Sequence, residues 1–126
     1  MRRVLLAAAA LALFAFVVPA KAQDAVKVDP KHYKVEFEND KIRVLRITYG
    51  PHEKSVMHDH PENVAVFLTD GHALFTMPDG TTVDAPVKAG SMQHDAGGKH
   101  LPENVGDTPF ELVLVELKHK PAPKAK

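Results

Sequence analysis

Short apolar runs separated by turn residues fill the middle of this chain. Tyr33, Val35 and Phe37 alternate with charged residues, and a second apolar run spans 42–49. Further short runs lie at 64–68, 73–77, 81–83 and 110–117. Alternation with a period of two is typical of strands, and no window shows sustained helical spacing. The pattern therefore predicts an all-β sandwich or barrel.

Turn signals and one irregularity add detail to this pattern. Asp70 and Gly71 predict a two-residue hairpin between the third and fourth runs, and the segment 78–80 predicts the next turn. The second run changes parity between Val44 and Leu45. Such a slip indicates either a β-bulge or a strand that is covered on both faces.

The N-terminal residues have the layout of a secretory signal peptide. Arg2 and Arg3 precede an unbroken apolar run over 4–18, and a small-x-small sequence ends at Ala22. The run is shorter than the roughly 20 residues of a membrane-spanning helix, although an uncleaved anchor is the alternative. The sequence therefore predicts a signal peptide over 1–22 and an exported protein, either periplasmic or secreted.

After cleavage, the chain is expected to form one domain. The polar residues 23–31 predict a flexible N-terminal segment, and residues 32–118 predict the barrel. Alternating Lys, Ala and Pro predict a disordered basic tail over 119–126.

Cleavage also changes the charge balance. It removes three of the sixteen basic residues and none of the sixteen acidic ones, which leaves a net charge of −3. No basic excess is then left to bind nucleic acid phosphates or a membrane surface. The chain has no Cys, which excludes disulfides, thiol catalysis and thiolate metal sites.

The eight histidines supply the candidate chemistry. His58 and His60 form a His-x-His pair, which in a strand places both rings on one face, and imidazole is a common metal ligand. His100, from a distant strand, could complete a metal site. The alternative without a metal is that the His58 and His60 rings are simply solvated at a strand end. His94 could be a fourth ligand, a supporting group or a proton relay. Solvated or peripheral positions are expected for the other four, His32, His52, His72 and His119.

Two sets of residues carry a resemblance to a known family. The first set is Gly50, His58, His60 and Gly71, and the second is Gly90, Gly97, His100 and Asn104. Their order and spacing resemble the two motifs of cupins over residues 41–118, with Asp95 in place of a usual proline. The resemblance implies a small cupin-type double-stranded β-helix, or jelly-roll barrel.

One departure from the cupin motifs leaves two interpretations open. Val64 stands where the first motif has a glutamate ligand. In the first interpretation, His58, His60 and His100 form a three-histidine site, which by resemblance would hold a divalent Fe, Zn, Ni, Cu or Mn ion. In the second, loss of the glutamate has abolished metal binding, and the histidines line an apolar pocket. Glu62 is a candidate substitute ligand if a loop carries it inward.

The functional prediction is an exported cupin that binds a divalent metal and a small molecule. By resemblance to three-histidine cupins, the predicted enzyme class is a metal-dependent, dioxygenase-like oxidoreductase, with His94 or Glu62 as the acid–base candidate. The alternative is a non-catalytic module that binds a small ligand or a metal. Cupins often pair through edge strands, so a homodimer is expected, with the strand over 33–37 as a candidate edge.

Overall fold

The computed structural model describes residues 23–119. The predicted signal peptide and residues 120–126 of the predicted tail lie outside the described residues. The described elements are α1 (Ala25–Val28), β1 (Tyr33–Glu38), β2 (Ile42–Tyr49), β3 (His58–His60), β4 (Asn63–Phe67), β5 (Gly71–Thr76), β6 (Thr82–Val87), β7 (Met92–Asp95), β8 (Gly98–Asn104) and β9 (Phe110–Leu117). The predicted all-β class is confirmed.

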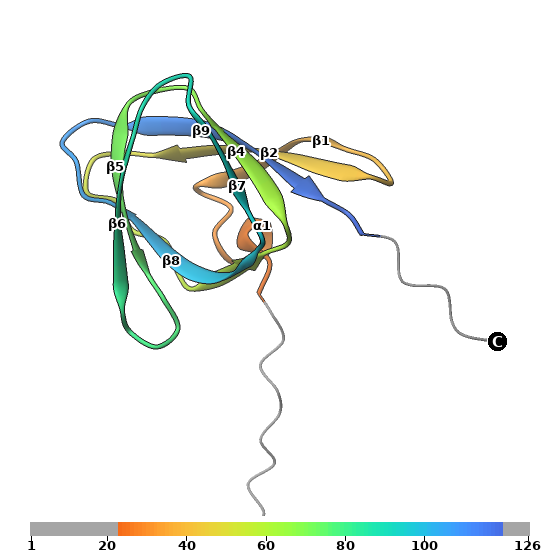
Figure 1. Ribbon diagram of the computed structural model, residues 1–126, viewed down its shortest axis with the longest axis horizontal. Helices are drawn as coiled ribbons and strands as arrows, with labels where there is room; N and C mark the ends of the chain where they lie inside the picture. Colours follow the sequence, from red (N-terminus) through yellow and green to blue (C-terminus); the bar gives the residue numbers. More distant parts are fainter. Residues whose placement is uncertain (1–22, 120–126) are drawn as a thin grey trace, which may run out of the picture.

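Two antiparallel sheets enclose the interior. The larger sheet has the order β1-β2-β9-β4-β7, and the smaller has the order β3-β8-β5-β6. Figure 1 shows the strands wrapped around a central space, with the β1–β2 hairpin and the end of β9 extending to one side. β7 is the last strand of the larger sheet, and β6 is the last strand of the smaller one.

The predicted Asp70-Gly71 hairpin is wrong. β4 pairs with β9 and β7, whereas β5 pairs with β6 and β8, so the segment between β4 and β5 crosses from one sheet to the other. Gly71 has a packing role, because a Cβ there would lie 2.7 Å from the Cβ of Phe110. The next predicted turn is confirmed, and Gly80 supplies its positive φ of 85°.

The predicted irregularity of the second run is a bulge on its partner strand. Val35 pairs with Leu45 and Phe37 pairs with Val44, so Glu36 is the extra residue on β1. β2 itself pairs with β9 without a break. The alternating side chains of β2 and β9 pack between the sheets, and Leu45, Ile47, Leu112 and Leu114 belong to the core.

The sequence predicts a flexible segment before β1, and the structure places a short helix there. Asp24 caps the short helix α1, and Ala25 is fully buried. The Asp24 carboxylate accepts two hydrogen bonds from the Arg43 guanidinium, at 2.7 and 3.1 Å. The Gln23 carbonyl also accepts a 2.8 Å hydrogen bond from the Asp59 amide. Polar side chains therefore fix this segment beside β3.

β1 lies at the edge of the larger sheet, as the sequence predicts. Val35 and Phe37 are about half exposed there, and pairing of two chains through this strand stays a prediction. Over residues 23–119, no helix has the length and apolar character that crossing a membrane requires.

Candidate metal centre

Three histidines meet between the two sheets. His58 and His60 share one face of β3, and β3 pairs with β8 so that His58 lies opposite His100. His58 and His60 are buried, and His100 is half-buried. One ring nitrogen from each histidine lies within 4.8 Å of those of the other two. The structure therefore brings together the three ligands that the sequence predicts.

The Nδ1 atoms of the two β3 histidines each make a hydrogen bond. His58 Nδ1–H donates to the Val56 carbonyl at 2.8 Å, because a carbonyl can only accept. His60 Nδ1–H donates to Glu116 Oε1, also at 2.8 Å. In the neutral form of each ring, Nε2 is therefore the unprotonated nitrogen, and this tautomer can bind a metal ion through Nε2.

Two ring nitrogens in this cluster lack a partner within residues 23–119. Nε2 of His58 and Nε2 of His100 are buried and make no hydrogen bond. Leaving a buried polar atom unpaired lowers the stability of the fold by about 1–3 kcal/mol, so a ligand on these two atoms would stabilise the protein. Ligands about 2.1 Å from one ion lie roughly 3–3.5 Å apart, so a bound ion would draw these rings closer. The donor set therefore fits a metal ion.

Two of the three rings have lowered pKa values. Burial and the neighbouring His60 lower the pKa of His58 to about 4. Burial likewise lowers the pKa of His100 to about 3, together with His60 and His58. Protons therefore do not compete with a metal ion for these two rings near neutral pH.

A chain of ion pairs contacts the His60 ring at its Nδ1 atom. Glu116 accepts from His60 and also from Arg43 Nε at 2.6 Å, and Arg43 in turn pairs with Asp24. Burial raises the pKa of Glu116, but the hydrogen bonds from His60 and Arg43 outweigh it and lower the pKa overall. Glu116 therefore stays ionised and fixes the tautomer of His60.

A second network supports His58 and corrects the expectation for His32. His32 is buried, and its ring nitrogens lie 2.7 Å from Asp29 and 3.0 Å from Glu53. Ser55 Oγ donates to Asp29 at 2.5 Å and lies 3.4 Å from His58 Nδ1. The ring of His32 also stacks on Tyr49 at a centroid distance of 4.3 Å. His32 is thus neither a ligand nor solvated, but part of the wall behind the cluster.

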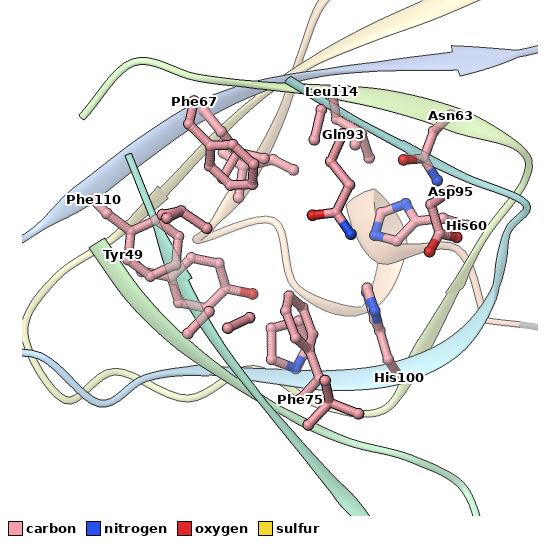
Figure 2. A pocket seen from close by; sticks show the side chains of 18 of the residues that line it. Tyr49, His60, Asn63, Phe67, Phe75, Gln93, Asp95, His100, Phe110 and Leu114 are labelled. Atoms are coloured by element: carbon pink, nitrogen blue, oxygen red, sulfur yellow. The ribbon is translucent and has the colours of Figure 1, made fainter. Parts of the chain in front are cut away.

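The cavity-facing residue of β4 is not Val64. Asn63 and Ala65 line the cavity, because alternate residues of a strand face the same side, and Val64 faces away from it. Asn63 lies next to His60 in Figure 2 and donates to the Pro61 carbonyl at 2.9 Å. The inward-facing residues of β4 therefore offer no carboxylate to the histidines.

The two acid–base candidates lie outside the cavity. His94 Nε2 is 2.8 Å from Glu62 Oε1 on the surface, and neither residue lines the cavity. The residues on either side of His94 along β7, Gln93 and Asp95, face the cavity instead. Their i, i+2 spacing in a short strand is the signal that could have found them.

Asp95 is held in place by the turn that follows it. Its Oδ1 accepts a 2.7 Å hydrogen bond from the Gly97 amide. Gly97 has a φ of 95°, and a Cβ there would lie 2.7 Å from the His60 carbonyl oxygen. Only glycine lets this turn lie so close to the end of β3, so the backbone itself positions a carboxylate beside the histidines.

Solved structures share this fold. A cupin domain from Bordetella pertussis is 27% identical, covers 69% of this chain and 92% of that chain, and has a TM-score of 0.65. An RmlC-like cupin with a double-stranded β-helix fold from Methanocaldococcus jannaschii is 19% identical, with coverages of 72% and 84% and a TM-score of 0.56. A double-stranded β-helix protein from Klebsiella pneumoniae is 23% identical, with coverages of 70% and 84% and a TM-score of 0.54.

No family model and no curated protein matches the sequence. The sheet order, the paired motif histidines and the structural neighbours nevertheless agree with one another. This chain has the double-stranded β-helix fold of small single-domain cupins.

Proposed function

We propose that this protein binds one divalent metal ion through His58, His60 and His100 and receives a small molecule in the adjoining cavity. The observation that carries the proposal is the pair of buried, unpaired Nε2 atoms of His58 and His100. Apolar surroundings make such atoms costly without a ligand. The hydrogen bonds that His58 and His60 make through Nδ1 leave Nε2 of each ring available to the ion, and one ring nitrogen of each of the three histidines lies within 4.8 Å of the other two.

The donor set indicates the kind of metal. Three neutral imidazoles suit Fe, Zn, Ni or Cu better than the hard cations Ca and Mg, which prefer oxygen ligands. The described residues add no carboxylate to the cluster, which also lowers the expected affinity for Mn. When bound, the ion would supply Lewis acidity or activate oxygen.

The residues at the edge of the cavity would act on the bound molecule. The Gln93 amide can both donate to and accept from a polar group, and the Asp95 carboxylate can accept a proton from a hydroxyl. By resemblance to three-histidine cupins, the proposed reaction class is a dioxygenase-like oxidation. Uptake of dioxygen with a bound organic molecule would support this class, and ligand binding without oxygen uptake would assign a non-catalytic binding module.

Metal analysis tests the central claim. The purified protein is reconstituted in turn with Fe(II), Zn, Ni, Cu and Mn, and bound metal is measured by mass spectrometry. We expect about one ion per chain in the wild type and loss of the ion in the His58→Ala/His60→Ala variant. The His94→Ala variant is the matched control, because His94 is exposed and lies outside the cavity. No uptake of any metal, or full uptake by a folded double variant, would overturn the proposal.

A further inference from the structure

The cavity beside the histidines has a size that limits its occupant. Its volume is about 290 Å³, and the exposed residues of its lining include Val83 on β6 and Gln93 and Asp95 on β7. A dry cavity of about 150 Å³ accommodates benzene in an engineered protein. One aromatic ring with small substituents therefore fits here.

The lining divides into an apolar part and a polar part. Phe67, Phe75 and Phe110 surround the side away from His60 in Figure 2, and Phe75 stacks on the His100 ring at 5.0 Å. Aliphatic side chains, including Ile47, Leu112 and Leu114, fill the wall between them. Such a lining favours the flat, apolar body of a ligand.

The amide and carboxylate groups of the lining gather at the histidine end, whereas the Tyr49 hydroxyl lies on the aromatic side and is paired with the Tyr33 hydroxyl at 2.6 Å. Asn63, Gln93 and Asp95 lie on the side of His60 in Figure 2, opposite Phe67 and Phe110, whereas Phe75 is the aromatic ring that reaches His100. A ligand with one polar end could direct it there and bury its remaining surface among apolar side chains. A polyhydroxylated ligand could not pair its other hydroxyls, and each unpaired one would weaken binding.

The charge of the lining excludes a further class. Among the described residues, no Lys or Arg lines the cavity, and Asp95 places a negative charge at its edge. An anion bound in the metal-free cavity would therefore be desolvated without a cationic partner and would face repulsion from Asp95.

We infer that the cavity selects a neutral, mostly apolar ring compound with a single hydroxyl group, which it directs toward the histidines. This inference rests on the proposed function, because it names the class of molecule that the same site would take. It deepens that proposal by excluding sugars, organic acids and phosphate esters as the preferred class for the metal-free cavity.

Calorimetric titration of the metal-free protein tests the ligand class without relying on the metal. The probes are 4-ethylphenol, the anion 4-hydroxybenzoate and the polyol myo-inositol, which are similar in size. We expect 4-ethylphenol to bind at least tenfold more tightly than either of the others. Equal or tighter binding of the anion or the polyol, or no binding of 4-ethylphenol, would overturn the inference.

A matched pair of variants places the binding inside the barrel. Ala65→Leu fills space on the inward face of β4, whereas Val66→Leu adds the same kind of bulk on the outward face. We expect at least a tenfold loss of 4-ethylphenol affinity for the first variant and none for the second. Should Ala65→Leu not fold, Gln93→Leu in the exposed part of the lining replaces it, with an expected severalfold loss. Unchanged affinity in the folded inward variant contradicts the inference.

Nuclear relaxation of the ligand tests its orientation in protein loaded with Mn(II). Ring protons next to the hydroxyl are expected to broaden more than the ethyl protons, and the reverse order would overturn the orientation. The outcomes separate the two proposals. Metal uptake without 4-ethylphenol binding defeats only the ligand class, whereas 4-ethylphenol binding without any metal uptake defeats only the metal centre.

Discussion

Two groups of histidine and carboxylate side chains in this protein differ in almost every physical respect. The inner group joins His58, His60 and His100 to Glu116 between the sheets. The outer group joins Glu62 on the surface to His94 and His119, whose Nε2 atoms lie 2.8 and 2.7 Å from its two oxygens.

The two groups differ in which ring nitrogen makes a hydrogen bond and in how exposed the rings are to solvent. In the outer group, Nε2 of each histidine is paired with a carboxylate, and water screens the charges. In the inner group, Glu116 accepts a hydrogen bond from Nδ1 of His60. The Nε2 atoms of His58 and His100 are buried and unpaired. Residue type alone therefore does not identify a metal site; the hydrogen bonds behind the rings do.

The largest expected effect follows from removing the charge behind His60. In Glu116→Gln, one amide oxygen must serve both Arg43 and His60, so the amide NH₂ group faces one of them. If it faces His60, the ring proton moves to Nε2 and blocks the ligating atom. We expect metal affinity to fall about 10–100-fold and unfolding free energy to fall by about 3 kcal/mol.

Glu62→Gln is the matched control in the outer group. Its side chain also contacts two basic groups, His94 and His119, but on the surface. We expect metal affinity and melting temperature to stay at the wild-type values. Isothermal titration with Zn and thermal melting measure both quantities. Equal losses in the two variants would show that the buried chain behind His60 has no special role.

The metal-free protein should lose stability in mild acid through its inner group. The pKa values of His58 and His100 are lowered to about 4 and about 3 in the folded protein, against about 6.5 in the unfolded chain. Between pH 6.5 and 4.5 the unfolded state therefore binds more protons, so stability falls as the pH falls. After allowance for solvent screening, we expect a loss on the order of 2 kcal/mol across this window.

Urea unfolding at a series of pH values measures this loss. The pKa values of Asp24, Asp29 and Glu116 are also lowered by the fold, but their effect is lost only as these carboxylates protonate, below this window. The His58→Gln/His100→Gln variant should show a flatter profile from pH 6.5 to 4.5. A His94→Gln variant should keep the wild-type slope, and an equal flattening there would contradict the assignment to buried rings.

The alternating pattern of the sequence predicted the fold class because each strand has one face toward the interior. The connection at Asp70 and Gly71 was mispredicted because a local turn signal cannot show which sheet the next strand joins. Gly71 is required for close contact with Phe110 instead. The contacts of the segment 23–31 could not be predicted, because its partners Arg43 and Asp59 lie far along the chain.

The three histidines could be predicted because the residues of each cupin motif lie close together in the sequence. The groups behind them were missed, although the strand pattern contains a signal. Arg43 shares the inward face of β2 with Leu45, and Glu116 shares the inward face of β9 with Leu114. A charged residue on an apolar face predicts a buried partner, but only the pairing of β2 with β9 identifies which one.

The smallest of the three effects tests which residue of β4 faces the ligands. Asn63 lies inward beside His60, whereas Val64 faces away from the cavity. Asn63→Glu would place a carboxylate next to three neutral imidazoles, and oxygen ligands favour harder cations. We expect Mn(II) affinity to rise about tenfold, which corresponds to about 1.4 kcal/mol, while Val64→Glu leaves it unchanged. Titration followed by electron paramagnetic resonance measures both. A gain in Val64→Glu alone would restore Val64 as the motif position and place the inward face of β4 one residue further along the chain.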